Sequence, residues 1–355
     1  RQEGIIHNLM LSKTLSGLIL VLTILSGVVI LSSVPKFEGE EAPRPSQKVA
    51  EERRRLTSLP SGTLSRFSLF PNSLKKPIPL AVMIENHEHA RPYHIGIDQA
   101  LVIQEFLVEG FISRFVAIID ARNLPKEIGP VRSLRPYFLD AIKPWSRTVF
   151  HAGGSPEALK RVQEGSEFYA LNLLYFDDKN GEYGSFRKDG PPAPHDLFLK
   201  KKVFKSFLEE VPERLLQQVS WPPYTIGIPD GGENASDIRV NFFNALHNVS
   251  FEYLPLAQKY QRTNGGEVSP ARPNTIAIME VPIDYIGEYG RLFMTLEGSG
   301  NVQIFHSGKV WEGRWSRGVD TQKFTFTNAD GEEIPFKAGQ LWMMVLPTLE
   351  RVSYE

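Results

Sequence analysis

An uncharged apolar stretch near the amino terminus constrains this chain more than any other feature. Its residues, LSGLILVLTILSGVVILSSV, run from Leu15 to Val34. A helix of about 20 residues is long enough to cross the ~30 Å hydrocarbon core of a bilayer, and helices of soluble proteins are rarely apolar all round over such a length. The stretch therefore predicts a signal anchor within residues 1–35 that holds the chain in a membrane as a single-pass protein. A cleaved signal peptide is the alternative, since the small residues Ser32 and Ser33 lie near the end of the stretch.

The composition excludes several classes of protein. The 355 residues carry 40 basic and 41 acidic side chains, for a net charge of −1, so general binding to nucleic acid is not expected. Cysteine is absent, which excludes disulfides, thiol catalysis, thiolate metal sites and lipid attachment through a cysteine of this sequence. We expect no cofactor.

The rest of the sequence divides into a stalk and two domains. Residues 36–76 mix charges, Pro and Ser with too few apolar residues to bury a core, which is typical of a flexible stalk. Alternating strands and helices predict an α/β (α+β) domain over residues 77–228. The turn-forming residues Ile228–Asn234 (IPDGGEN) mark its end, with a linker over residues 229–236. Residues 237–355 contain repeated strand signals and predict a smaller β-rich domain.

Short apolar runs and turn signals predict the individual elements. In the first domain we expect strands over Pro79–Ile84, Phe115–Asp120 and Thr148–His151, helices over Arg135–Ile142, Ser155–Glu164 and Lys200–Val219, and either a helix or a strand over Gln99–Val108. In the second domain we expect strands over Val249–Tyr253, Thr275–Glu280, Val302–His306, Lys323–Thr327 and Leu341–Leu346. Asn328–Gly331 (NADG) is a hairpin-turn signal.

A group of polar residues follows the first predicted strand. Glu85, His87 and His89 come at its end, where α/β proteins place ligand-binding groups. Glu85 is a candidate acid or base, and the alternative is that it acts as a cap or pairs with an arginine such as Arg91 or Arg114. His87 and His89, with His94 nearby, could suggest zinc, but their spacing matches no specific metal motif. We therefore predict no metal site.

A second candidate is the carboxylate pair Glu105 and Glu109, which lie four residues apart in an apolar context (IQEFLVEG). On a helix the two side chains share one face, and on a strand they also point the same way. Such a pair suits glycoside hydrolysis, in which one acid stays protonated beside the other. The alternative is structural, with each carboxylate paired to an arginine such as Arg114, Arg132 or Arg135.

Two arginines and a glycine turn form a polar surface in the first domain. Arg132 and Arg135, in GPVRSLRP, are suited to a bidentate grip on a carboxylate or phosphate. Gly153 and Gly154 let backbone amides approach a ligand, and Ser155 carries the marks of a helix start, where anions bind. These five residues are the predicted binding site for an anion or acidic sugar. Buried ion pairs with the glutamates named above are the alternative role of the two arginines.

Two histidines complete the candidates. His151 precedes the glycine turn, and His195 lies in a proline-rich loop (PPAPHD), so each imidazole is a candidate base. Ser155 lies near His151 but lacks the small-residue elbow that exposes a nucleophilic serine, so nucleophilic catalysis is not expected. The segment Arg262–Gly266 (RTNGG) is interpreted as a polar hairpin tip.

Taken together, these segments resemble the YerB-like family of bacterial envelope proteins, a domain of unknown function usually found as a lipoprotein or anchored exoprotein. The resemblance covers nearly everything from Ile78 onward. It rests on several blocks in order: IPLAVMIENHEHARP from Ile78, QEFLVEGFISRF from Gln104, IGPVRSLRPYFLD from Ile128, HAGGSPEAL from His151, APHDLF from Ala193, YQRTNGG from Tyr260, GKVWEGRW from Gly308, and Pro335–Pro347. The resemblance implies a two-domain extracytoplasmic protein with an α/β first domain and a β-rich second domain, and no established reaction.

The sequence departs from the family pattern in two places. Many members attach through a lipidated cysteine, which is absent here, and the Leu15–Val34 stretch is expected to take its place. Val268–Pro273 also lacks the His and Asp that the family tends to have after the Gly-Gly. Any site built on those two residues is therefore not expected in this chain.

These observations predict an envelope protein on the outer side of the cell membrane. Its partner is a wall polymer or a protein of wall synthesis, bound through a cleft lined by Arg, Glu and His. The alternative is a carbohydrate-active (peptidoglycan) hydrolase that uses Glu85, Glu105 or Glu109. Two carboxylates about 5 to 9.5 Å apart in an open groove favour the hydrolase, whereas carboxylates locked to arginines favour the binding protein.

Overall fold

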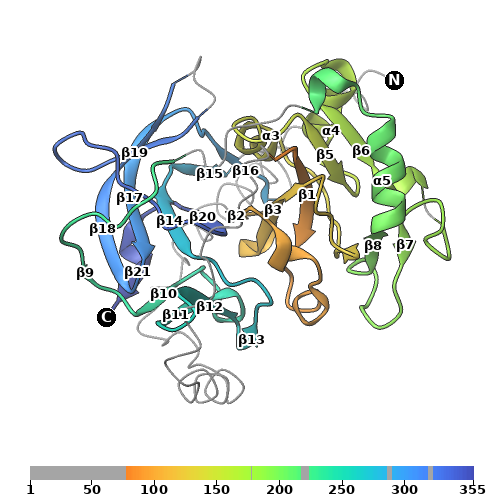
Figure 1. Ribbon diagram of the computed structural model, residues 1–355. Helices are drawn as coiled ribbons and strands as arrows, with labels where there is room; N and C mark the ends of the chain where they lie inside the picture. The colour runs from red at the N-terminus through yellow and green to blue at the C-terminus, as the bar shows by residue number, and fades with distance from the viewer. Residues whose placement is uncertain (1–76, 177, 217–223, 286–289, 319–322) are drawn as a thin grey trace, which may run out of the picture. The chain divides into compact units, whose positions relative to one another are not determined.

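The structure is a computed structural model that describes residues 77–355, except residue 177 and the segments 217–223, 286–289 and 319–322. These residues form a strand-rich fold with few helices (Figure 1). The expected anchor Leu15–Val34 and the expected stalk lie outside the described residues. Within the described part, no helix is both long enough and apolar enough to cross a membrane.

The main sheet contains strands from both predicted domains. From the first come β1 (Pro79–Glu85), β2 (Val102–Leu107), β3 (Ser113–Asp120), β5 (Thr148–His151) and β6 (Tyr169–Asn172). From the second come β9 (Glu233–Asn234), β14 (Thr275–Glu280), β17 (Gly298–His306), β18 (Lys309–Arg317), β19 (Thr325–Thr327) and β20 (Leu341–Leu346). The 11-stranded sheet has the order β19-β18-β17-β14-β20-β2-β3-β1-β5-β6, with β9 paired to β18. The two groups of strands meet at the parallel pair β2 and β20.

Three α-helices are found in the described residues, all in the first half: α3 (Pro136–Ile142), α4 (Pro156–Glu164) and α5 (Lys201–Glu209). They cover the strands of that half, since Phe138 of α3 contacts Phe106 of β2 and Phe204 of α5 contacts Phe150 of β5. Strands β1 and β2 are buried at every position. Continuous burial explains why β1 is an apolar run without alternation up to Glu85, whereas β2 buries Gln104 and Glu105 among its apolar residues.

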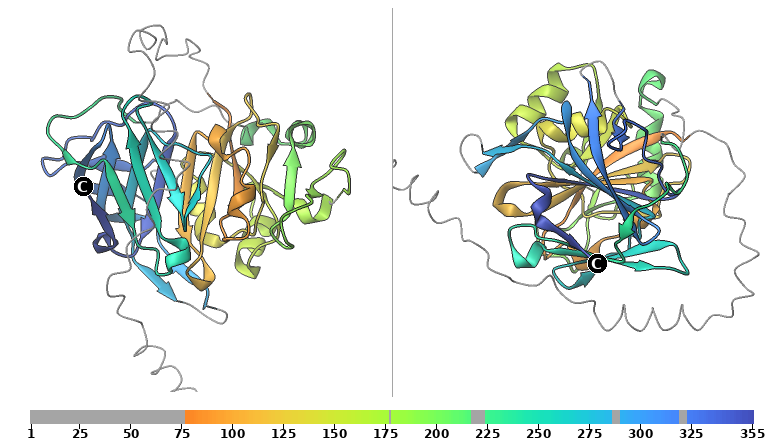
Figure 2. Two further views of the ribbon diagram at one scale, coloured as in Figure 1. Left: turned by 90° about the horizontal axis from the view of Figure 1, so that it is seen from below. Right: turned by 90° about the vertical axis from the view of Figure 1, so that its left-hand side faces the viewer.

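A second sheet packs against the β-rich part of the main sheet (Figure 2). Its order is β13-β12-β11-β10-β21, built from β10 (Asp237–Val240), β11 (Val249–Leu254), β12 (Lys259–Asn264), β13 (Glu267–Val268) and β21 (Val352–Tyr354). Two small sheets complete the fold: β15 (Ile283–Tyr285) with β16 (Leu292–Met294), and β4 (Glu127–Ile128) with β8 (Leu197–Lys200) and β7 (Phe186–Arg187).

The predicted strands are all present, and the ambiguous segment Gln99–Val108 contains strand β2. The helix predicted over Lys200–Val219 is too long, because α5 ends at Glu209 and Pro212 follows. Proline cannot donate the hydrogen bond that would continue the helix, which explains the early end. The turn at Asn328–Gly331 is confirmed by a hydrogen bond from the Gly331 amide to the Asn328 carbonyl.

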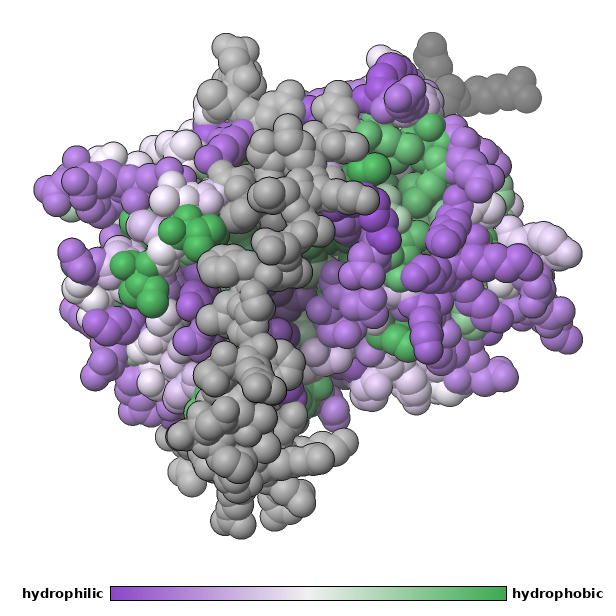
Figure 3. Space-filling view, in the orientation of Figure 1, coloured by the Kyte–Doolittle hydropathy of each residue, from purple (hydrophilic) through white to green (hydrophobic). Residues whose placement is uncertain are grey.

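The described surface in the view of Figure 3 is largely hydrophilic. The largest group of hydrophobic residues lies in the upper right of that view, over the part where Figure 1 labels β5 and β6, and smaller groups lie on its left side.

Candidate functional site

The Glu85 carboxylate is buried where β1 ends. It forms an ion pair with Arg132, and Arg114 lies opposite it on β3. The Nδ1 atom of His195 lies 3.6 Å from Oε2 of Glu85, which is longer than an ordinary hydrogen bond. Burial raises the pKa of Glu85, but His195, Arg114 and Arg132 outweigh this effect and lower the pKa to about 2. Glu85 is thus held as a carboxylate at neutral pH, in agreement with the arginine-pairing alternative.

Three imidazoles gather beside this carboxylate. The rings of His87 and His195 are stacked with their centroids 4.6 Å apart. The ring of His89 lies 4.9 Å from that of His87 and 6.0 Å from that of His195. One nitrogen atom can be taken from each of the three rings such that all three atoms lie within 4.8 Å of one another. His195 is buried and His89 is exposed, so the cluster reaches the surface on one side.

His94 lies apart from this cluster. Its Nε2 atom is 2.6 Å from the backbone oxygen of Glu85, so the imidazole donates a hydrogen bond there. Burial lowers the pKa of His94 to about 4, and the ring is neutral at neutral pH. The residue that joins His87 and His89 is therefore His195, which is remote in sequence and was not grouped with them.

Glu105 lies in β2 and is fully buried at the junction of the two sheets. Its Oε1 atom accepts hydrogen bonds from Arg262 at 2.7 Å and from Ser113 at 2.6 Å. Its Oε2 atom accepts one from the indole of Trp342 at 2.9 Å. Glu105 thus pairs with an arginine, but the partner is Arg262 of β12 and none of the arginines considered from the sequence.

Two further arginines are buried: Arg262, which was not expected in a site, and Arg91, which was a possible partner of Glu85 but bonds elsewhere. The Arg262 guanidinium packs over the ring of Trp342, 4.6 Å from its centroid. Arg91 donates to the backbone oxygen of Leu246 at 2.5 Å and contacts the Nδ1 atom of His247. The hairpin predicted over Arg262–Gly266 is present, since β12 and β13 pair across Gly265 and Gly266, but Arg262 itself lies within β12. Every residue of β12 except the first is buried although most of its side chains are polar. The local sequence pattern therefore does not reveal that Arg262 is buried.

Glu109 lies beyond the end of β2, in a 3-10 turn, and does not share a site with Glu105. It binds Arg135 with two hydrogen bonds, 2.6 Å from Nε to Oε1 and 2.8 Å from Nη2 to Oε2. Burial raises the pKa of Glu109, but its bonds to Arg135 outweigh burial and lower the pKa. Each of the two carboxylates is held by a different arginine, which favours their structural role over a catalytic pair.

The glycine turn after β5 is held by internal hydrogen bonds. The Gly153 amide donates to the side chain of Asn172 at 2.9 Å, and the Gly153 carbonyl accepts from Nδ1 of His151 at 2.8 Å. Ser155 caps helix α4, since its hydroxyl accepts from the Ala158 amide at 3.3 Å and its own amide donates to Leu134. The cap confirms the predicted helix start. The amides of Gly153 and Ser155 are already bonded, which reduces what the turn can offer an anion.

These contacts decide what chemistry the carboxylates can perform. A glycosidase needs one carboxylic acid with a raised pKa as its proton donor. Glu85 and Glu109 instead have lowered pKa values, and Glu105 is locked to Arg262 without exposure to solvent. His151 is buried and bonded to Gly153. The arrangement therefore supports binding better than general acid catalysis.

An exposed cluster of aromatic rings follows Glu109 along the chain. Phe111 is 41% exposed, and its ring lies 5.3 Å from Phe243 and 6.0 Å from Tyr285. Phe111 and Phe243 have positive φ angles of 58° and 66°, which bulky residues rarely adopt. Strained residues that hold aromatic rings at the surface are typical of an interaction site.

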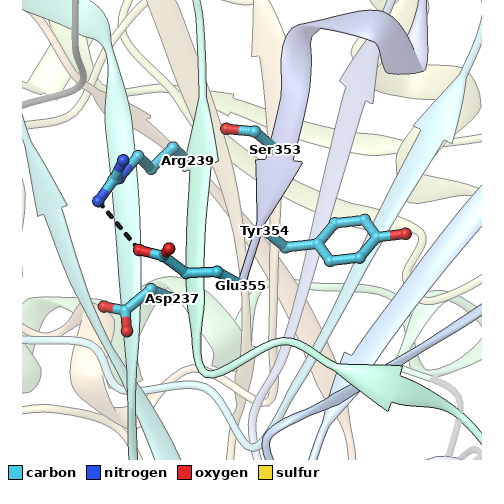
Figure 4. A pocket seen from close by; sticks show the side chains of 5 residues that line it. All are labelled: Asp237, Arg239, Ser353, Tyr354 and Glu355. Carbon is cyan, nitrogen blue, oxygen red and sulfur yellow. Dashed lines mark hydrogen bonds and ion pairs between the residues drawn. The ribbon is translucent and has the colours of Figure 1, made fainter.

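A small cavity lies between β10 and β21 and involves none of the candidate residues (Figure 4). Its volume is about 110 Å³, and it is lined by Asp237, Arg239, Ser353, Tyr354 and Glu355. An ion pair of 3.3 Å joins Arg239 and Glu355 there. Ligand pockets usually measure about 300 to 1,000 Å³, so this cavity is too small for a polymer segment.

Comparison with known proteins gives one family over most of the chain. Residues 69–214 match the N-terminal domain, and residues 238–343 the C-terminal domain, of the family described as "Protein of unknown function (DUF3048)". "Putative lipoprotein YerB" of Bacillus subtilis (strain 168) is 29% identical over 286 residues, which cover 78% of this chain and 83% of that protein. A crystal structure of the YerB protein from Bacillus subtilis matches with a TM-score of 0.70 at 28% identity, covering 81% of this chain and 96% of that one.

Proposed function

Because this chain belongs to the YerB-like family, we propose that it is an extracytoplasmic protein of the bacterial cell envelope. The name of its Bacillus subtilis relative describes a lipoprotein. In this chain the uncharged stretch Leu15–Val34 would serve as a single-pass membrane anchor in place of the lipid. Residues 36–76 would form a stalk that carries an α/β domain (77–228) and a β-rich domain (237–355) outside the membrane.

We infer further that the protein binds an anionic polymer of the cell wall, and that Arg132 is the principal contact. The Nε atom of Arg132 faces Glu85, and its side chain remains 27% exposed. No other residue of the described part binds its two terminal nitrogens. A partly exposed guanidinium with free donors suits a carboxylate or phosphate ligand. This free end of Arg132 is the observation that carries the proposal.

The exposed rings of Phe111 and Tyr285 add a surface for the sugar part of such a polymer. The flat apolar faces of sugar rings pack well on aromatic rings, and exposed aromatic clusters mark interaction surfaces. Arg135 is the second candidate contact, although Glu109 and the Leu134 carbonyl occupy three of its nitrogens. Gly153, Gly154 and Ser155 would shape the neighbouring surface. A protein of wall synthesis, rather than the polymer, is the other partner that the test distinguishes.

The test is co-sedimentation of the full chain, solubilised in detergent, with purified insoluble wall material. Arg132→Ala is expected to weaken binding about tenfold, which corresponds to roughly 1.4 kcal/mol and to one charge-assisted hydrogen bond. Arg122→Ala is the matched control, because Arg122 also pairs with a carboxylate, Asp120, at a strand end. It should bind as the unmodified chain does.

Equal binding by the unmodified chain and by Arg132→Ala would contradict the proposal. Absence of binding to wall material, with capture of a wall-synthesis protein that depends on Arg132, would assign the site to a protein partner. Incubation with purified glycan strands tests the hydrolase alternative. We expect no new reducing ends and no muropeptides, and their appearance would overturn the non-catalytic assignment.

A further inference from the structure

The cluster of His87, His89 and His195 has no role in the polymer binding proposed above. Two strand-end residues and one distant loop residue supply it, and it combines a buried, a half-buried and an exposed ring. His89 is exposed, yet its ring lies beside the other two, 4.9 Å from His87 and 6.0 Å from His195. We propose that these three histidines bind a divalent transition metal ion of the zinc class.

The surroundings of the two less exposed histidines support this site. The Nδ1 atom of His195 faces the Glu85 carboxylate at 3.6 Å, and the Nδ1 atom of His87 faces the Glu88 carboxylate at 3.3 Å. Histidines that bind metals almost always present their other nitrogen to a carboxylate, a carbonyl or a water. In both residues this arrangement leaves Nε2 for the metal. In the structure the Nδ1 atom of His87 also accepts from the backbone amide of His89 at 3.3 Å, so a metal on Nε2 requires the tautomer whose Nδ1 proton points to Glu88 instead.

The geometry requires only small side-chain movements. Zinc binds imidazole nitrogen at about 2.0 to 2.1 Å in tetrahedral geometry, so two nitrogens on one ion lie about 3.4 Å apart. One nitrogen of each ring, Nδ1 or Nε2, already lies within 4.8 Å of one nitrogen of each of the other two rings. Rotation of the exposed His89 ring, together with a slight turn of His87, can close the remaining gap. Glu85 and Glu88 place negative charge beside the ion, which favours a cation there.

Three protein ligands leave a fourth position on the ion. Metal sites with three ligands and an open position bind water or a ligand there, whereas structural zinc sites are closed by four protein ligands. The site would therefore be of the open kind, at the surface next to the Glu85–Arg132 pair. An acidic group of a bound ligand could occupy the open position.

The test uses the full chain in detergent, stripped of metal with a chelator and titrated with Co²⁺. We expect saturation at one Co²⁺ per chain, with the visible absorption bands of four-coordinate Co²⁺, and loss of these bands when Zn²⁺ displaces it. His89→Ala is expected to weaken Co²⁺ binding by at least about 100-fold at an unchanged melting temperature, because His89 is exposed. Glu88→Gln acts through His87 and is expected to weaken binding by about tenfold.

His7→Ala is the matched control, since it removes a histidine from the segment before the apolar stretch and should leave the titration unchanged. The proposal is overturned if His89→Ala and His87→Ala bind Co²⁺ as the unmodified chain does. It is also overturned if the unmodified chain shows no bands that saturate at one equivalent. Arg132→Ala should keep Co²⁺ binding, so the outcome is independent of the polymer-binding test.

Discussion

Glu105 and Arg262 form a buried ion pair that joins strands β2 and β12. Both side chains are at most 2% exposed, and the pair is 2.7 Å long. Removing one partner leaves a charge in the interior without compensation, which typically costs about 3 to 5 kcal/mol. The hydrogen bonds from Ser113 and Trp342 complete the shell of Glu105, so the carboxylate cannot turn toward water.

We therefore expect Arg262→Leu to lower the free energy of unfolding by about 3 to 5 kcal/mol, measured by urea denaturation of the full chain. Arg239→Leu is the control, because its ion pair with Glu355 is exposed and should contribute less than about 1 kcal/mol. The double variant Glu105→Leu with Arg262→Leu should recover part of the loss, since it removes both buried charges. A loss in Arg262→Leu no larger than in the control would contradict this account.

His306 gives the folded protein a dependence on pH. Its side chain is buried, donates from Nε2 to the Pro335 carbonyl at 3.1 Å and stacks on Trp311. Burial lowers its pKa from 6.5 to about 4; the hydrogen bond to the Pro335 carbonyl opposes this shift, and the positive charge of Lys337 adds a smaller lowering effect. The folded state then binds fewer protons than the unfolded state between these values. Stability is complete above pH 6.5 and is lost as the pH falls toward 4.

The expected slope is up to about 1.4 kcal/mol per pH unit for this one histidine in that window. His306→Gln can still donate to Pro335 but cannot titrate, so its free energy of unfolding should fall less steeply between pH 6.5 and 4. Urea denaturation at half-unit steps of pH measures both curves. Parallel curves for the two proteins would show that His306 does not titrate in this window.

At the scale of elements, helix α4 depends on its first residue. The Ser155 hydroxyl accepts from the Ala158 amide, and Pro156 and Glu157 follow in the first turn. Replacing a serine at this position by alanine usually costs about 1 kcal/mol. We expect Ser155→Ala to lower the free energy of unfolding by about that amount and Ser155→Asp, which can still cap, to preserve it. If Ser155 instead contacts the polymer, Ser155→Asp should keep its stability and lose binding to wall material.

The elements were predictable wherever their signals are local. The buried strand β1 consists of apolar residues up to its last residue, Glu85, and α4 carries its cap, its proline and its acid within three residues. Helix α5 was predicted too long because its amphipathic pattern continues past Pro212. The helix nevertheless ends at Glu209, since proline cannot donate the backbone hydrogen bond that would continue it. The contacts of Arg262 and His195 could not be predicted, because each joins segments that are more than 100 residues from their partners. Such pairing is set by the sheet register, which a single sequence does not reveal.

At the scale of the whole described part, the two matched family domains share one sheet. Strand β20 lies between β14 and β2, parallel to both. The side chain of Gln340 donates to the backbone oxygens of Ile97 and Ala100 at 3.0 and 2.9 Å. Glu105 of the first domain is paired with Arg262 of the second. Neither half can keep these contacts by itself, although each has its own family description.

We expect residues 77–228, produced alone, not to fold. Without β20 the strand β2 becomes a sheet edge, an apolar surface is exposed and Glu105 loses both Arg262 and Trp342. The amide NMR spectrum of this fragment should show little dispersion, and its far-ultraviolet circular dichroism should show no cooperative melting. Residues 77–355 should melt in one transition, and mixing fragments 77–228 and 229–355 should restore dispersed signals because each supplies the other's missing strand. A dispersed spectrum and a cooperative transition for 77–228 alone would instead show that the first domain is an independent folding unit and that the shared sheet is only an interface.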